Sequence, residues 1–357
     1  MIEMPMNKEF KNYLDIIQLH KKIKFNTLFL EITNSCNCKC KHCYNSSGEK
    51  KAIEFSMEEF NKTVSEFLKY KITSVVLSGG EALLHPNIWN FIDILREKKL
   101  DVTLLTNGKL LNNESVKRLK SRKVYIQLSL DGASPVTNDF IREKGSFHDA
   151  MNALTVLNEQ KYTERLSVNT VINSVNCNEV LDIINICEKF SVSAIGFNFL
   201  NNSGRAKKNG LFVTENELYH TINRINKNRN GENIKVRPIN VTHKCRFCNC
   251  DDEVFLNPVV DVFGNVYMCE FLRDEVFSIG NVFKKTLEDI LCDDPIKRNL
   301  LLLNIRQSYI KSCRNCAVKS KCGAGCIVQN NDDNYFEPKF CILIKKNFLN
   351  ELGGSKL

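Results

Sequence analysis

Short apolar runs alternate with longer amphipathic stretches over residues 27 to about 227. Capping boxes predict helix starts at Ser56 with Glu59 and at Thr214 with Glu217. The apolar runs are rich in β-branched and aromatic residues and predict strands at 27–33, 74–78, 101–106, 125–129, 167–172 and 194–199. This alternation predicts an α/β fold with a parallel sheet and right-handed crossovers.

The alternation stops near residue 230, where cysteines become frequent and periodic apolar positions become rare. We therefore expect four parts: an N-terminal segment 1–26, a βα region 27–229, a small, loop-rich, cysteine-rich domain 230–345 and a tail 346–357. A length of 357 residues fits two domains, and 43% hydrophobic residues suffice for their cores. No apolar run reaches the length of a membrane-spanning helix, so no membrane partner is expected.

The chain has 16 cysteines, and their state depends on the redox compartment. The first 26 residues contain no apolar run of signal-peptide length, so we expect a cytoplasmic protein with reduced thiols. Clustered cysteines then indicate metal binding. Four cysteines do not fit the cluster spacings and are interpreted as ordinary core or surface residues, namely Cys38, Cys177, Cys187 and Cys292.

Three cysteines, Cys36, Cys40 and Cys43, form a CxxxCxxC pattern directly after the first predicted strand. Electron-transfer clusters are held by four cysteines, so three thiolates on a four-iron cube leave one iron for a small molecule. Zinc is the alternative, because it takes four ligands and both Cys38 and His42 are within reach. CxxxCxxC is not a usual zinc spacing, which favours the cluster.

Residues 33–44, TNSCNCKCKHCY, resemble the cluster loop of the radical S-adenosylmethionine (SAM) enzymes. The six βα units match the partial (β/α)6 barrel of that family. The GGE, TNG and SLDG segments of the family have counterparts at the ends of the second, third and fourth predicted strands. A Gly-Gly turn alone is weak evidence, because it is commonly just a tight corner. The GGE segment supports the resemblance because it follows the second predicted strand. The resemblance implies an active face at the carboxyl ends of the strands, with candidate SAM contacts at His42, Ser78, Gly79, Gly80, Glu81, Asn107, Ser129, Asp131, Arg142 and Asn169.

The resemblance also implies individual roles for four of these residues. Glu81 would accept hydrogen bonds from the SAM ammonium, and Arg142 would bind the methionine carboxylate. Asn169 would reach the ribose, and His42 holds the position of an aromatic residue that packs on the adenine. Three of these roles have structural alternatives: a solvated surface arginine, an asparagine that satisfies loop backbone, and a histidine that merely covers the cluster.

Nine cysteines beyond residue 240 resemble in spacing the SPASM domain, a C-terminal extension of radical SAM enzymes with two auxiliary [4Fe-4S] clusters. The resemblance implies an outer cluster held by Cys313, Cys316, Cys322 and Cys341. It implies an inner cluster on Cys269 and Cys326 with two of Cys245, Cys248 and Cys250, where Cys245 and Cys250 are favoured. A zinc ribbon with knuckles at Cys245 and Cys313 is the alternative.

Three clusters would alter the charge balance of the chain. The formal net charge is +9 with every cysteine neutral, and three thiolate-bound cubes lower it to about +4. The basic excess is thus largely counter-charge, and no nucleic-acid partner is expected.

The family resemblance implies radical chemistry on a peptide or protein substrate. It implies that SAM is cleaved to a 5′-deoxyadenosyl radical, which abstracts hydrogen from a peptidyl residue, while the auxiliary clusters accept an electron. We expect a maturase of a ribosomally made peptide; a sulfatase-maturating enzyme and an iron-sulfur electron carrier are the alternatives. Glu270, directly after Cys269, is a candidate general base unless it points to solvent. Expected partners are a flavodoxin or ferredoxin and, because the first 26 residues are too few for a fused leader-binding domain, a separate leader-peptide-binding protein; a leader groove of the chain's own is the alternative.

Overall fold

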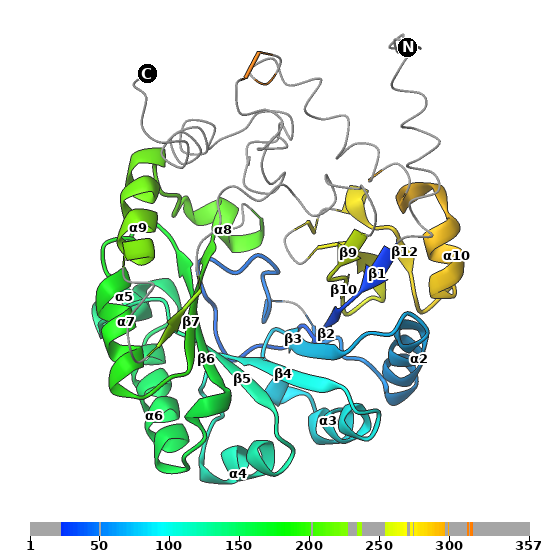
Figure 1. Cartoon of the computed structure of the whole chain (residues 1–357), viewed down its shortest axis with the longest axis horizontal. Coiled ribbons are helices and arrows are strands. Elements are labelled where there is room, and N and C mark those ends of the chain that lie inside the picture. The colour runs from blue at the N-terminus through cyan, green and yellow to red at the C-terminus, as the bar shows by residue number, and fades with distance from the viewer. Residues whose placement is uncertain are drawn as a thin grey trace. The chain divides into compact units, whose positions relative to one another are not determined.

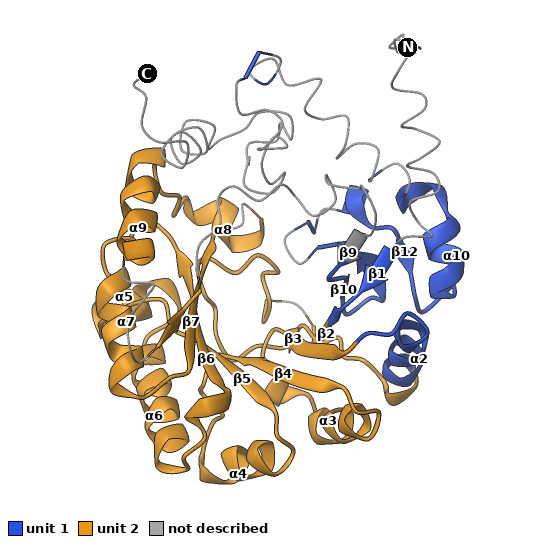
Figure 2. Cartoon of the chain, viewed as in Figure 1, with its two compact units in different colours: residues 1–28, 59–72, 241–357 blue, residues 29–58, 73–240 orange. Residues whose placement is uncertain are grey.

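The chain forms two compact units, one of residues 1–28, 59–72 and 241–357 and one of residues 29–58 and 73–240 (Figure 2). Most of the predicted βα region lies in the second unit. The computed structural model describes residues 23–49, 51–200, 203–227, 234–237, 254–269, 272–273, 275–296, 299, 313 and 315–316.

A parallel sheet organises the second unit (Figure 1). Its strands pair in the order β2 (Thr27–Thr33), β3 (Ser74–Gly79), β4 (Asp101–Thr106), β5 (Tyr125–Ser129), β6 (Leu166–Ile172), β7 (Ala194–Phe199) and β8 (Lys235–Val236). The pairs from β3 to β8 are parallel. All six predicted strands are confirmed to within one residue. Strand β8 was not predicted, because two residues are too few to show a period.

Helices follow the strands, and the longer ones lie along the outer side of the curved sheet in Figure 1. The helices are α3 (Ile88–Glu97), α4 (Asn113–Ser121), α5 (Pro135–Ile141), α6 (Ser146–Glu159), α7 (Val180–Lys189), α8 (Gly204–Asn209) and α9 (Glu215–Lys227), with the 3-10 turns η2 (Ala82–Leu84) and η3 (Thr163–Arg165). The predicted capping box before α9 is confirmed: Glu217 N donates to Thr214 Oγ1 at 3.3 Å and Thr214 N donates to Glu217 Oε2 at 2.8 Å.

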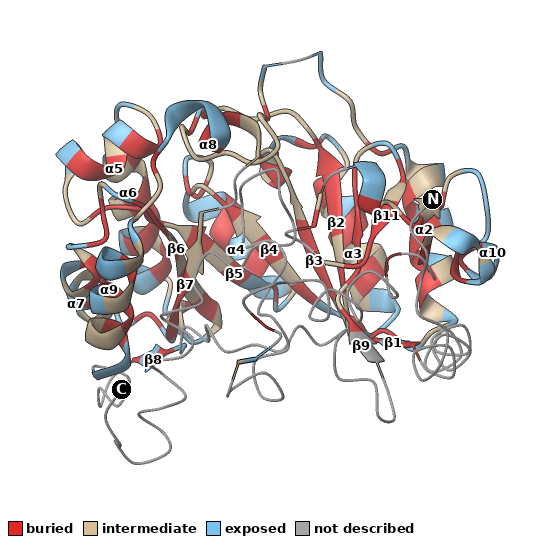
Figure 3. Ribbon diagram, turned by 90° about the horizontal axis from the view of Figure 1, so that it is seen from above, coloured by how far each residue is buried: buried red, intermediate tan, exposed pale blue. Residues whose placement is uncertain are grey.

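Buried residues are frequent along the strands, as Figure 3 shows by colour. In β6, Leu166, Val168, Thr170 and Ile172 are buried, and the three residues between them are partly exposed. This period of two sets a hydrophobic outer layer and an inner face with polar positions.

The described residues of the first unit form two small strand groups and two helices. Strands β1 (Ile23–Phe25) and β9 (Val254–Leu256) are parallel, and an antiparallel meander joins β10 (Val259–Val260), β11 (Asn265–Tyr267) and β12 (Gly280–Asn281). The helices are α2 (Met57–Leu68), which begins after the predicted cap Ser56, and α10 (Leu287–Cys292); a 3-10 turn η5 spans Glu275–Phe277. Among the described residues, no helix is both long and apolar enough to cross a membrane.

Candidate functional site

The loop after β2 carries Cys36, Cys40 and Cys43 and is fastened to the carboxyl ends of β3 and β4. Gly80 N donates to the Thr33 carbonyl and Glu81 N to the Ser35 carbonyl, each at 2.8 Å. Asn107, at the end of β4, donates from Nδ2 to Asn37 Oδ1 at 2.8 Å. The structure therefore brings the predicted GGE and TNG segments to the cysteine loop.

The two glycines of the GGE segment allow this close approach. A Cβ on Gly79 would lie 2.1 Å from the Thr33 carbonyl oxygen, and Gly79 has φ +133°. A Cβ on Gly80 would lie 2.1 Å from the Ser35 carbonyl oxygen. Their visible role is to admit the backbone of the cysteine loop, whereas the sequence suggested an approach to a ligand.

Glu81 is buried at the junction of β3 and β4. Its Oε2 accepts a hydrogen bond from Asn107 N at 2.8 Å, and its Oε1 accepts one from Leu83 N at 3.2 Å. Burial raises the pKa of Glu81, and these two backbone donors oppose that rise. The Thr106 side chain is a third hydrogen-bond partner of this carboxylate.

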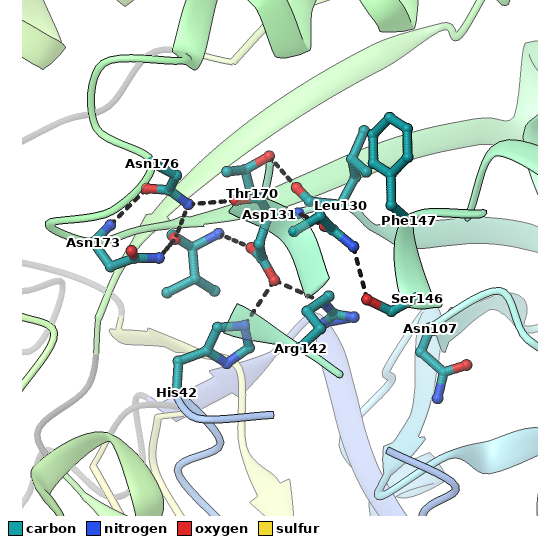
Figure 4. Close-up of polar contacts among 12 residues, drawn as sticks. His42, Asn107, Leu130, Asp131, Arg142, Ser146, Phe147, Thr170, Asn173 and Asn176 are labelled. Carbon is teal, nitrogen blue, oxygen red and sulfur yellow. Dashed lines mark hydrogen bonds and ion pairs between the residues drawn. The ribbon is translucent and has the colours of Figure 1, made fainter. Parts of the chain in front are cut away.

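A buried network joins His42, Asp131 and Arg142 (Figure 4). Asp131 Oδ2 lies 2.7 Å from His42 Nε2 and accepts a hydrogen bond from Arg142 Nε at 2.8 Å. Its Oδ1 accepts one from Val171 N at 2.7 Å. Burial raises the pKa of Asp131, but the charges of His42 and Arg142 lower it below its ordinary value. Asp131 is thus an ionised bridge whose two oxygens already have protein partners.

This network changes the interpretation of two predicted SAM contacts. The Arg142 side chain is only 9% exposed, so the alternative of a solvated surface arginine is wrong. Asp131 can influence a ligand through His42 and Arg142, because both of its oxygens are engaged. Two asparagines that no motif indicated hold its backbone: Asn138 Oδ1 accepts from Asp131 N at 2.8 Å, and Asn176 Nδ2 donates to the Asp131 carbonyl at 2.9 Å.

The thiols of the loop have the donor chemistry of an iron-sulfur site. A hydrogen bond from the Cys38 thiol, together with the charges of Arg142 and His42, lowers the pKa of Cys40 to about 5 against the effect of burial. Burial raises the pKa of Cys36 to about 11, so metal binding would displace its proton. Within the described residues, no three His, Cys, Asp or Glu side chains converge on a point suited to one metal ion. Soft thiol donors beside cationic groups fit a multi-iron cluster.

A short helix far along the chain, α8, holds the same loop. Arg205 donates from Nε to the Cys40 carbonyl at 2.7 Å and from Nη1 to the Ser47 carbonyl at 3.0 Å. Its Nη1 also lies 2.9 Å from Glu49 Oε1, and its backbone N donates to the Cys43 carbonyl at 2.9 Å. Sequence reasoning missed Arg205, because a single arginine in a six-residue helix carries no motif.

Ser129 and Asn169 lie opposite each other on β5 and β6. Both are partly exposed on the inner face of the sheet. Asn198 Nδ2 donates to Asn169 Oδ1 at 3.1 Å, so Asn169 is held by a side chain of β7. Asn169 is thus partly exposed rather than a buried residue that satisfies loop backbone.

Three predicted auxiliary ligands lie within the described residues. Cys269 follows β11 and is partly exposed, Cys313 is buried, and Cys316 N donates to the Cys313 carbonyl at 3.3 Å, which closes a turn over this CxxC pair. The other predicted ligands and the candidate base lie outside the described residues and stay predictions: Cys245, Cys248, Cys250, Cys322, Cys326, Cys341 and Glu270.

Comparison with known proteins matches both parts of the chain. Residues 30–187 match the model of the radical SAM superfamily, and residues 248–317 match that of SPASM, an iron-sulfur cluster-binding domain. The chain is 26% identical to the antilisterial bacteriocin subtilosin biosynthesis protein AlbA of Bacillus subtilis (strain 168), over 90% of this chain and 72% of AlbA. It is also 26% identical to the mycofactocin maturase MftC of Mycobacterium ulcerans (strain Agy99), over 83% and 81% of the two chains.

A solved structure shares the fold. Native anSMEcpe with bound AdoMet superposes with a TM-score of 0.71, over 91% of this chain and 96% of that chain, at 19% sequence identity. Similarity at this identity establishes the predicted architecture, a partial α/β barrel followed by a small cysteine-rich domain.

Proposed function

This chain belongs to the radical SAM superfamily and carries a SPASM domain, and we propose that it oxidatively modifies a residue of a ribosomally made peptide. SAM and [4Fe-4S] clusters are its cofactors. When bound, they supply a 5′-deoxyadenosyl radical that abstracts a hydrogen atom from the substrate. The similarity to a bacteriocin biosynthesis protein and a mycofactocin maturase supports a peptide substrate.

The observation that carries the proposal is the attachment of the cysteine loop to three successive strand ends. The GGE segment binds the loop through Gly80 N and Glu81 N. Asn107 binds it from the end of β4, and Asp131, after β5, binds it through His42. The carboxyl ends of parallel strands are where barrel folds place their chemistry.

Each group at these strand ends has a proposed role. Cys36, Cys40 and Cys43 would hold the SAM-binding cluster. Arg142, fixed by Asp131, would bind the methionine carboxylate, because a guanidinium suits a carboxylate and this one is buried and oriented. Glu81 would accept a hydrogen bond from the ammonium. The partly exposed side chains of Ser129 and Asn169, Ser78 and the GGE backbone would contact the remainder of SAM.

The C-terminal region completes the proposal. Two auxiliary clusters, three clusters in all, would be held there by eight of the nine spaced cysteines, and Glu270 would serve as general base. A flavodoxin or ferredoxin would donate the electron, and a separate protein would bind the peptide leader. A sulfatase-maturating activity is the competing assignment, and the substrate that is modified decides between the two.

The proposal is tested by incubating the reconstituted protein with SAM, dithionite and any short peptide that is encoded beside the gene. We expect 5′-deoxyadenosine and a peptide product of lower mass by two hydrogens. Replacing Cys36, Cys40 and Cys43 together by alanine abolishes both and lowers the iron content from about twelve to about eight per chain. Cys292→Ala, at an exposed position, is the matched control. Retained SAM cleavage in the triple variant, or loss of all its iron, contradicts the assignment.

A further inference from the structure

Four neighbouring strands bring one residue each into a row on the inner face of the sheet. Ser129 on β5 pairs with Asn169 on β6, and Asn169 pairs with Gly196 on β7. Val236 on β8 pairs with Ile195, and Arg237 N donates to the Ile195 carbonyl at 2.8 Å. Arg237 therefore lies opposite Gly196 and completes the row.

The row faces away from the helices. Leu128, Val168 and Val236, the neighbours of row residues along their strands, are buried. Ser129 and Asn169 are partly exposed and Arg237 is exposed. Because side chains alternate between the two faces of a strand, Arg237 belongs to the same inner face as the proposed SAM contacts.

Gly196 is buried and presents no side chain in this row. A Cβ built on Gly196 would lie 3.6 Å from Arg237 Cδ and 3.6 Å from Asn169 Oδ1. The side chains of Arg237 and Asn169 therefore border a position that has no side chain of its own. A Cβ at 3.6 Å makes ordinary van der Waals contact, so alanine fits there and packs against both side chains.

Hydrogen-bond donors flank Gly196. Asn198 Nδ2 donates to Asn169 Oδ1 at 3.1 Å, which leaves the Asn169 Nδ2 group available to a ligand. The Arg237 guanidinium is always charged, and it takes part in no ion pair with a described residue. A planar cation with parallel N–H donors is suited to a carboxylate.

We propose that Arg237, beside Gly196, forms a binding site for a carboxylate of the peptide substrate, an acidic side chain or the C-terminal carboxylate. The inference rests on the proposed function. Strands are about 4.8 Å apart, so the backbone of Arg237 lies about 10 Å from that of Asn169, on the side away from Ser129. The site thus extends beyond the proposed nucleoside contacts, and the SAM carboxylate is already assigned to Arg142.

Steady-state kinetics with the peptide encoded beside the gene test the site. We expect Arg237→Gln to raise KM for the peptide about tenfold or more with a smaller effect on kcat. The KM of Arg237→Lys is expected to lie between those of the wild type and Arg237→Gln. Gly196→Ala is expected to raise KM without a change in charge. The wild type is expected to have a lower KM for the unmodified peptide than for the same peptide with its carboxylates replaced by amides. Arg237→Gln is expected to lose this difference. Lys235→Gln removes one positive charge from the same strand and is the control, with KM within about twofold of wild type.

Crystals of the reconstituted holoenzyme soaked in sodium selenate give a readout that needs no peptide. We expect a selenium peak beside Arg237 in the wild type and none in Arg237→Gln. Absence of the peak in the wild type, an equal peak in the variant, or equal KM values for Arg237→Gln and Lys235→Gln overturns the site. Failure of the wild type to cleave SAM with dithionite contradicts the proposed function instead, and the selenate result still decides whether the anion site exists.

Discussion

Arg205 Nε donates to the carbonyl oxygen of Cys40 at 2.7 Å, although 165 residues separate them in the sequence. The same guanidinium reaches the Ser47 carbonyl and Glu49, so one buried cation fixes the turn that carries Cys40 and Cys43. Burial lowers the pKa of Arg205, but the hydrogen bond to Glu49 and the charges of Cys43 and Cys40 raise it above its ordinary value. Arg205 is therefore a positioning residue for the cysteine loop.

Replacing Arg205 by glutamine is expected to lower SAM cleavage at least about tenfold and to remove up to about four irons per chain, because charged hydrogen bonds contribute about 1.5–3 kcal/mol each. Arg205→Lys keeps the charge but cannot bond three acceptors at once, so an intermediate loss is expected. Iron analysis and 5′-deoxyadenosine formation measure both. Arg165→Gln, at an arginine stacked on Tyr125, is the control, and wild-type values for Arg205→Gln would contradict the positioning role.

Two glycines at the ends of α8 provide a matched pair. Gly204 and Gly210 have φ +55° and +60°, so alanine at either position adopts a left-handed conformation that costs about 1–2 kcal/mol. A Cβ on Gly204 would lie 2.3 Å from the Tyr44 carbonyl oxygen, whereas nothing lies within 4 Å of one on Gly210. Gly204→Ala is therefore expected to contain less iron than Gly210→Ala and to unfold at a lower urea concentration. Equal midpoints and equal iron contents would show that contact with the loop is unimportant.

Asp131→Asn tests the buried bridge. The substitution keeps the shape but removes the anion between Arg142 and His42, and breaking a buried pair costs about 3–5 kcal/mol. We expect a clear loss of urea stability and of SAM cleavage. Asp149→Asn removes the carboxylate of a partly exposed pair with Lys109 at 3.8 Å, and a change below about 1 kcal/mol is expected there. Equal effects of the two substitutions would argue against a special role for Asp131.

The sequence predicted the strands and the identity of Asp131, but not the partners of Asp131. Strand positions follow from a local period in burial, as in β6, and Asp131 stands in a recognisable segment. Its pairing with His42 spans 89 residues and depends on how β5 and the cysteine loop meet. Arg205 and Arg237 were missed for the same reason, since the proposed role of each depends on contact with a loop or strand that is distant in the sequence.

Asp139 provides a pH-dependent contribution to stability. Burial raises its pKa, but hydrogen bonds from the backbone N–H groups of Phe147 and Gly145 and from the Ser146 hydroxyl lower it below its ordinary value. A carboxyl group whose pKa is lower in the folded than in the unfolded state stabilises the folded protein. The stabilisation is complete above the pKa of the unfolded state, about 3.9, and is lost as the pH falls through the pKa of the folded state. Asp139→Asn is therefore expected to lower Tm near pH 7 and to approach wild type below about pH 4. A Tm difference that stays constant down to about pH 3 would contradict this assignment.

Removal of iron is expected to disorder residues 240–345 before the barrel. That segment has many spaced cysteines and few periodic apolar positions, so ligation energy replaces much of the apolar burial that a domain of its size otherwise needs. The parallel sheet, by contrast, has a fully buried apolar layer that includes Leu104, Ile126 and Val168. Limited trypsin digestion of chelated and reconstituted protein, read by mass spectrometry, should show new early cleavages confined to residues 240–345. An unchanged digestion pattern in that segment after complete removal of iron would show that its fold does not depend on the clusters.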